Sequence, residues 1–165
     1  MSDDLVQKVS QFVTYEAECL DHQRWDEWLS LMDENIQYWV PAWHSESELT
    51  NNPRRELSLM YYDSRQGLED RVFRIRSGRS VASNPMPRTC HFVTNVRAQM
   101  QADGSCHAVA NWQTLSWRNK KTSTYYGFYD YVLTATEGVL GWRIQRKKIT
   151  VLNSLIENVL DVYLI

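Results

Sequence analysis

Apolar residues recur every three or four positions along the first part of the chain. Between Leu5 and Leu20 this spacing predicts an amphipathic helix, with Ser2, Asp3 and Asp4 available to cap its start. The apolar stripe of this helix consists of Leu5, Val9, Phe12, Val13, Ala17 and Leu20. Such an apolar stripe has to pack against the surface of another element, such as a sheet.

A second, shorter helix is predicted after the polar turn at residues 21–23. Its apolar positions are Trp25, Trp28, Leu29 and Met32, at spacings of three, four and seven. A brief strand, Ile36 to Val40, then ends at Pro41. The polar segment that follows, as far as about Arg55, is predicted to be a loop.

A third amphipathic helix is predicted after residue 63, and the Ser/Asn/Pro-rich stretch from Ser77 to Pro87 is predicted to be a second surface loop. Asp63 or Ser64 can cap this helix, with Gln66 reaching back to Asp63 as in a capping box. The buried stripe of the helix consists of Leu68, Val72 and Ile75.

The outer side of the third helix and the loop after it are rich in arginine. Arg65–Glu69 and Asp70–Arg74 are spaced four apart, so a solvated face with intrahelical ion pairs is one interpretation. The other is a surface where carboxylates of a partner meet these forked donors. The arginines concerned are Arg71, Arg74, Arg76, Arg79 and Arg88.

The second half of the chain predicts four long strands that form a meander of hairpins. Their approximate ranges are Arg88–Met100, Ser105–Arg118, Lys121–Thr134 and Trp142–Ile156. Asp103-Gly104 is a two-residue turn signature, and Asn119-Lys120 could form a similar tight connection. Helices first and antiparallel strands later predict an α+β fold, a curved sheet closed like a cone by helices on one side. We expect a single domain over residues 1–165.

Composition narrows the classes of function. The 18 basic and 20 acidic residues give a formal net charge of −2, which provides no general attraction to nucleic acid or to an anionic membrane. There is no signal-peptide pattern and no apolar run of membrane-spanning length. Three cysteines without the spacing of a disulfide framework fit a reducing compartment, so a cytoplasmic protein is expected.

Two Cys-His dipeptides, Cys90-His91 and Cys106-His107, suggest a metal site at first sight. Adjacent residues of a strand point to opposite faces of a sheet, so neither pair can hold one ion with both side chains. If Asp103-Gly104 is a two-residue turn, Cys90 lies near Trp117 and Cys106 near Gln101, far apart along the strands. We therefore expect no metal and no cofactor bound by this chain.

An acid/base group is the main alternative to a non-catalytic chain. His91 is the most plausible proton-transfer residue, and Asp130 and Tyr126 share one face of another predicted strand. Together they could serve a stand-alone isomerase or dehydratase with a pocket inside the cone. A simple ligand-binding dimer of the same fold, with an apolar pocket, is a third possibility.

The chain ends in an apolar run without a polar tail, and Tyr163 lies within it. Chain ends fray unless they are docked, so the run is expected to be buried either in this domain or against another subunit. The run consists of Val159, Leu160, Val162, Tyr163, Leu164 and Ile165.

Four segments together resemble one known family, the small (beta) subunit of aromatic-ring-hydroxylating dioxygenases. They are EAECLDHQRWDEWLSLM at 16–32, YWVPAW at 38–43, YYDSRQGLEDRVFRIRSGR at 61–79 and PMPRTCHFVTNV at 85–96. Trp43, the Tyr126-Gly127 pair, residues 151–153 and the final DVYLI look closest to the benzoate and anthranilate branch.

The resemblance implies a nuclear-transport-factor-like cone whose role is structural. Three copies would assemble with three large (alpha) subunits, which carry a Rieske [2Fe-2S] cluster and a mononuclear Fe(II), and a reductase would supply electrons. The substrate would be an aromatic carboxylate. Residues expected at subunit interfaces are Arg71, Arg74, Arg76, Arg79, Arg88, His91 and Tyr163.

Overall fold

The computed structural model describes residues 3–153 and 160–165. Its helices are α1 (Asp3–Asp21), α2 (Trp25–Ser30) and α3 (Arg65–Arg76). Its strands are β1 (Met32–Pro41), β2 (Ser58–Tyr62), β3 (Arg88–Met100), β4 (Cys106–Arg118), β5 (Lys121–Ala135) and β6 (Trp142–Val151). Short 3-10 turns are η1 (Val81–Ser83), η2 (Val139–Gly141) and η3 (Val162–Leu164).

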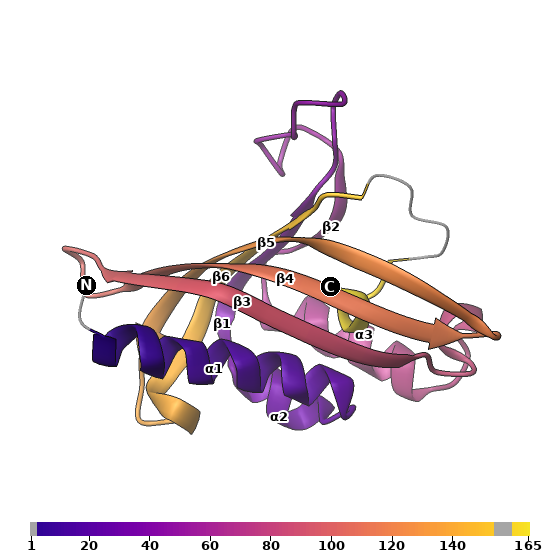
Figure 1. Cartoon of the computed structure of the whole chain (residues 1–165), viewed down its shortest axis with the longest axis horizontal. Coiled ribbons are helices and arrows are strands. Elements are labelled where there is room, and N and C mark those ends of the chain that lie inside the picture. Colours follow the sequence, from indigo (N-terminus) through magenta and orange to yellow (C-terminus); the bar gives the residue numbers. More distant parts are fainter. Residues whose placement is uncertain (1–2, 154–159) are drawn as a thin grey trace.

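The six strands form one sheet in the order β2-β1-β6-β5-β4-β3. All neighbouring pairs are antiparallel except β1 and β6, which are parallel. The helices lie on one side of the curved sheet, with α1 running along β3 (Figure 1). The α+β architecture with helices against one face of a curved antiparallel sheet is therefore confirmed.

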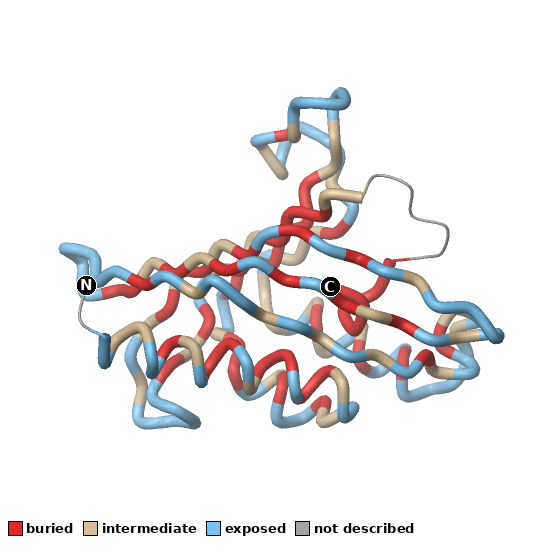
Figure 2. Tube along the Cα trace, in the orientation of Figure 1, coloured by how far each residue is buried: buried red, intermediate tan, exposed pale blue. Residues whose placement is uncertain are grey.

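Alternation along the strands gives the sheet two distinct faces. We call the face toward the helices the inner face; on β4 it carries Ala108, Ala110 and Trp112, all buried. The intervening residues of β4 point to the opposite, outer face. Figure 2 shows this alternation of buried and exposed positions along the long strands. The apolar core fills the space between the inner face and the helices.

An ion pair lies inside this core. The Lys147 ammonium contacts both oxygens of the Glu16 carboxylate, at 2.7 Å and 3.0 Å. The Tyr131 hydroxyl donates to the same carboxylate at 3.2 Å, and the Trp28 indole N–H donates to it at 3.4 Å. Burial lowers the pKa of Lys147, and the Glu16 charge opposes that shift.

The strand predictions were accurate for β3, β4 and β5. The predicted last strand ends at Val151 instead, and the predicted residues 154–156 lie outside the described part of the chain. Met32 begins β1 rather than closing the second helix, because its backbone pairs with Ile144 of β6. The short strand β2 was not predicted.

The hairpin connections behave differently from one another. Asn119 and Lys120 form the predicted two-residue turn, both with positive φ (52° and 60°), opposite Arg118 and Lys121. The predicted Asp103-Gly104 two-residue turn is wrong, since the loop is wider and Met100 pairs with Cys106. An irregularity between Thr94 and Arg97 then moves Cys90 opposite Leu115 rather than Trp117.

Candidate functional site

Arg71, the first of the predicted interface arginines, is bonded within the chain. Its Nε lies 2.9 Å from Asp161 Oδ1, and its Nη2 donates to the Leu160 carbonyl at 3.1 Å. Burial alone would lower the pKa of Arg71, but the hydrogen bond to Asp161, the Asp161 charge and the smaller effects of Tyr62 together outweigh burial, and the pKa rises. Arg71 thus fastens α3 to the C-terminal segment.

The other arginines of this set lie at the surface. Arg76 pairs with Asp26 of α2 at 3.0 Å, and both side chains are well exposed. Arg74, Arg79 and Arg88 are exposed as well. These residues leave forked cationic groups along α3, in the loop after it and at the start of β3.

The local predictions for α3 are met in part. Arg65 pairs with Glu69 at 3.1 Å as expected. Gln66 donates to Asp70 at 2.9 Å, so it does not reach back toward residue 63. Ser64 is the N-cap residue but makes no capping hydrogen bond with its side chain, and the predicted capping box is therefore wrong.

His91 lies on the inner face, where its side chain is fully buried. Its Nδ1 is 2.5 Å from Asp21 Oδ1, and its backbone N–H donates to Asp21 Oδ2 at 2.8 Å. The Nε2 atom faces the main-chain oxygen of Ile165 at 3.4 Å. Burial would raise the pKa of Asp21, but the hydrogen bonds from His91 lower it overall. His91 therefore joins the end of α1 to β3 and to the C-terminal segment.

The acid/base group proposed from the sequence does not form. Asp130 and Tyr126 lie on the outer face, whereas His91 points to the inner face, so the sheet separates them. Asp130 instead pairs with His107 at 3.2 Å, and both side chains are more than a third exposed. The prediction failed because it did not fix the face of β5 relative to β3.

The two Cys-His dipeptides also behave as ordinary strand residues. Cys90 is exposed on the outer face beside the inward His91, and Cys106 is buried on the inner face beside the outward His107. Within residues 3–153 and 160–165, no three His, Cys, Asp or Glu side chains gather as a metal site would require. The donor set of these residues does not fit a Rieske cluster or a mononuclear iron.

Tyr163 lies with the C-terminal segment in the core. Its hydroxyl is 2.9 Å from Ser83 Oγ and also donates to the Ala82 carbonyl at 3.3 Å. Residues 160–165 are all buried within the chain, as one of the two sequence interpretations expected; Val159 lies outside the described residues.

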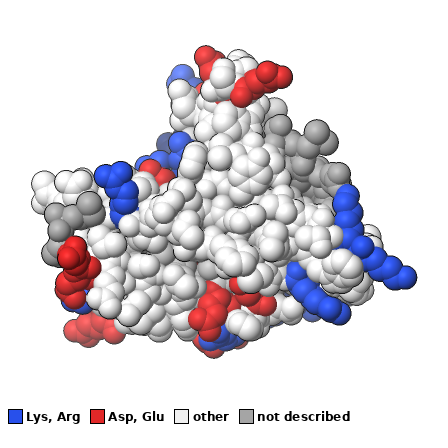
Figure 3. All heavy atoms as spheres, viewed as in Figure 1, with Lys and Arg blue, Asp and Glu red and all other residues white. Residues whose placement is uncertain are grey.

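The outer face carries an exposed group of large rings that the sequence patterns alone did not single out. The cross-strand register places Phe92, Gln113 and Tyr126 in one row. We call Phe92, Trp117, Tyr126 and Phe128 the outer aromatic patch; each of these residues is between 43% and 49% exposed. Figure 3 shows a face whose centre is uncharged, with lysine, arginine and acidic side chains toward its edges. Half-exposed rings on an uncovered sheet face are typical of protein contact surfaces.

A projecting arm formed by residues 42–57 extends away from the sheet beyond β1 and β2 (Figure 1). Trp43 anchors its base, since the indole N–H donates to the Val151 carbonyl at 2.8 Å. Leu57 is 83% exposed near the return to β2. The arm thus offers a second apolar contact point at the surface.

Comparison with known proteins defines the class. The family model described as ring hydroxylating beta subunit matches residues 15–158, and the chain belongs to this family. It is 42% identical over 155 residues to the 2-halobenzoate 1,2-dioxygenase small subunit of Burkholderia cepacia, covering 94% of this chain and 93% of the relative. It is 40% identical over 163 residues to the anthranilate 1,2-dioxygenase small subunit of Acinetobacter baylyi, covering 99% of each.

A solved structure agrees with these sequence relatives. The crystal structure of the beta subunit of the benzoate 1,2-dioxygenase from Burkholderia mallei superposes with a TM-score of 0.76 at 34% identity, covering 95% of each chain. None of the helices in the described part of the chain has the length and apolar character needed to span a membrane.

Proposed function

We propose that this chain is the assembling small subunit of a cytoplasmic dioxygenase that adds both atoms of O₂ to an aromatic carboxylate. The named substrates of its relatives, 2-halobenzoate, anthranilate and benzoate, support that substrate class. The observation that carries the proposal is the outer aromatic patch on a chain in which the His91 side chain is fully buried and bonded to Asp21, itself 16% exposed. Such a surface is suited to binding companions rather than to turnover.

Under this proposal, three copies of the chain assemble with three large subunits. The large subunits carry the Rieske [2Fe-2S] cluster and the mononuclear Fe(II), and a separate reductase delivers electrons to the complex. The described residues of this chain offer no matching ligand set, which supports placing the redox cofactors on the larger partner.

The interface residues fall into two groups by their surroundings. We propose that the outer aromatic patch together with Arg74, Arg79 and Arg88 touches companion subunits directly. Arg88 starts β3 opposite Trp117, so cationic and aromatic contacts lie side by side there. The remaining candidates act by holding surfaces in place through intrachain bonds: Arg71, Arg76, His91 and Tyr163.

Assembly measurements test the proposal. The chain is produced together with its cognate large subunit, and the population of hexamer is measured by analytical ultracentrifugation over a dilution series. Phe128→Ser should weaken assembly at least about tenfold, because an aromatic contact of the patch is lost. Arg88→Ala should weaken it by about 2–5 kcal/mol where a partner carboxylate is left unpaired.

Val139→Ser is the matched control, because Val139 is 46% exposed on η2, away from the patch, against 49% for Phe128. Its assembly should equal that of the unmodified chain. Equal assembly of the Phe128 variant and the control would refute the role of the patch. Oxygenation of benzoate by the purified small subunit alone would refute the division of labour.

A further inference from the structure

Three large apolar side chains are far more exposed to solvent than the rest. Val81 is 85% exposed, Leu57 83% and Phe73 76%, whereas the other exposed large apolar residues of the described chain lie between 42% and 49%. None of the three belongs to the outer aromatic patch. Leu57 lies on the projecting arm, and Phe73 and Val81 lie on α3 and η1. Two further surfaces of the chain therefore present apolar groups for contact.

The first of these surfaces is hollow. A groove of about 650 Å³ in the arm has Trp43, Leu49 and Leu57 in its lining, together with Glu48 and Glu56. Both glutamates are exposed, and neither forms an ion pair within the described part of the chain. The arm groove thus combines an apolar floor with two free carboxylates.

Hydrogen bonds hold the arm in shape. Trp43 and Leu49 form an antiparallel bridge, and the Thr50 backbone N–H donates to the Ala42 carbonyl at 2.9 Å. The Thr50 hydroxyl donates to the Leu57 carbonyl at 3.1 Å, which ties the outgoing and returning segments of the arm together. A groove that is already ordered avoids much of the entropic cost of binding.

The second surface projects from the end of α3. We call Phe73, Arg74, Arg79 and Val81 the α3 knob. Arg74 and Arg79 are exposed, and neither forms an ion pair with another described residue. The Asp70 carboxylate, one turn before Arg74, is engaged by a hydrogen bond from Gln66. The α3 knob thus combines apolar side chains with two free guanidinium groups.

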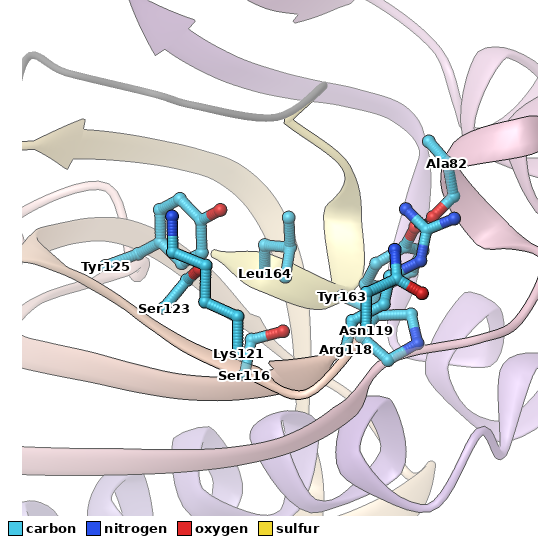
Figure 4. Close-up of a pocket in the computed structure, with 10 residues that line it drawn as sticks. Ala82, Ser116, Arg118, Asn119, Lys121, Ser123, Tyr125, Tyr163 and Leu164 are labelled. Atoms are coloured by element: carbon cyan, nitrogen blue, oxygen red, sulfur yellow. The ribbon is translucent and has the colours of Figure 1, made fainter.

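The turn that carries Val81 is supported from below. The Arg118 guanidinium donates to the carbonyls of Val81 and Asn84, the second at 3.3 Å. Figure 4 shows Ala82 of η1 beside Arg118 and Tyr163, and the Tyr163 hydroxyl donates to the Ala82 carbonyl at 3.3 Å. The α3 knob is therefore held in position, as the arm groove is.

The arm groove and the α3 knob are complementary in shape, in apolar character and in charge. Both surfaces belong to this chain, so the partner that fits each of them is a second copy. Figure 1 shows the arm projecting away from the side of the sheet on which α3 lies. A contact between two different surfaces of one chain is head-to-tail, and such contacts can close into a ring.

We propose that the arm groove of one copy receives the α3 knob of the next copy. The Phe73 ring lies against the apolar lining of the groove, and the guanidinium groups of the knob face its carboxylates. This inference rests on the proposed function, in which three copies assemble, and it assigns the contact between the small subunits. The outer aromatic patch is left available for the large subunit.

Sedimentation velocity of the purified chain, without the large subunit, tests this contact over a dilution series. The unmodified chain should associate up to a trimer. Leu57→Ser and Phe73→Ser should each weaken association at least about tenfold, because each removes an apolar anchor from one side of the contact. Val139→Ser, at a residue 46% exposed on η2, is the control and should associate like the unmodified chain. Circular dichroism checks that the variants remain folded.

Charge reversal tests whether these two surfaces meet each other. Reversing both arm glutamates, by Glu48→Lys with Glu56→Lys, brings like charges together and should weaken association at least about tenfold. Reversing both knob arginines, by Arg74→Glu with Arg79→Glu, should do the same. A chain that carries all four substitutions should recover most of the association, because opposite charges face each other again.

A chain that stays monomeric at every concentration would overturn the proposal. So would association that Leu57→Ser and Phe73→Ser leave unchanged, a variant with four substitutions that does not recover, or growth beyond the trimer without limit. These failures are distinguishable from a failure of the proposed function, because hexamer formation with the large subunit is measured separately through Phe128→Ser.

Discussion

Glu16→Gln isolates the contribution of the buried ion pair, because it removes the charge and keeps the size and shape of the side chain. Glu16 and Lys147 are 1% and 0% exposed, and the shortest distance between ammonium and carboxylate is 2.7 Å. Tyr131 donates to Oε1 and Trp28 to Oε2, so one of these two donors can still meet the amide oxygen of the new residue while the other faces its amide nitrogen. The substitution therefore leaves one uncompensated ammonium in the core.

The expected loss of unfolding free energy can be worked out from the distance between the Lys147 ammonium and the Glu16 carboxylate. Two unit charges 2.7 Å apart attract by about 6 kcal/mol at an effective dielectric constant of about 20. The Lys147 ammonium remains 4.2 Å from the centre of the Tyr129 ring, a contact that retains about 1–2 kcal/mol. Breaking a buried pair by removing one partner costs about 3–5 kcal/mol, and the variant should fall in that range.

The loss of unfolding free energy caused by Glu16→Gln should become smaller as pH rises. Burial already lowers the pKa of Lys147, and without the Glu16 charge the pKa falls further. Between this lowered pKa and about 10.5, the unfolded chain binds more protons than the native one, so the unfolding free energy of the variant rises with pH by up to about 1.4 kcal/mol per unit. The difference in unfolding free energy between the wild-type protein and the Glu16→Gln variant should therefore become smaller as the Lys147 ammonium loses its proton.

Urea unfolding followed by circular dichroism at pH 7 and pH 9 measures both effects. Lys148→Met is the control, since the neighbouring Lys148 lies on the outer face over the Trp39 ring and should cost less than about 1 kcal/mol. Replacing both members of the pair, Glu16→Leu with Lys147→Met, should recover most of the loss. A Glu16→Gln cost no greater than that of the control, or a deficit that widens with pH, would refute this reasoning.

Two further predictions concern other parts of the fold. Asp21→Asn should cost about 1–3 kcal/mol in urea unfolding at pH 7 by weakening the bonds to His91. Folding lowers the pKa of Asp21, so its carboxylate contributes fully to the unfolding free energy above about pH 4. That contribution is lost as pH falls through the pKa of Asp21 in the folded protein. The unfolding free energies of the wild-type protein and the variant should therefore converge in acid and not above about pH 5. Gly127→Ala would place a Cβ 1.8 Å from the Thr150 carbonyl oxygen, so thermal melting should show a loss above about 3 kcal/mol. The exposed Gly138→Ala, with ordinary contacts at 3.5 Å, should change stability by less than about 1 kcal/mol, and similar melting of these two glycine variants would contradict the steric argument.

Elements defined by local patterns were predictable from the sequence. The long strands β3 to β5 follow from alternation, and the turn at Asn119-Lys120 follows from residues that tolerate positive φ. Strand β2 was missed because its five residues include one buried side chain, Met60, and so give little periodic signal. Its pairing with β1 is a tertiary contact.

Long-range partners explain most of the errors at the candidate site. Arg71 and Asp161 are 90 positions apart, and His91 meets Asp21 across 70, so no local pattern shows that these groups satisfy one another. The outer aromatic patch could have been noticed in β5, where apolar and aromatic residues occupy both alternating sets of positions. A strand with two apolar faces needs cover on both sides.

The parallel pairing of β1 with β6 has a consequence for how the protein is made. Tyr38 and Trp39 pair with β2 on one side, but on the other side their partners are Lys147 and Lys148, which are synthesised more than a hundred residues later. Contacts of such separation slow folding, and they leave an unpaired strand edge on the nascent chain until the last strand has emerged from the ribosome. The centre of the sheet is therefore expected to complete its pairing only after β6 has been synthesised and inserts between β1 and β5.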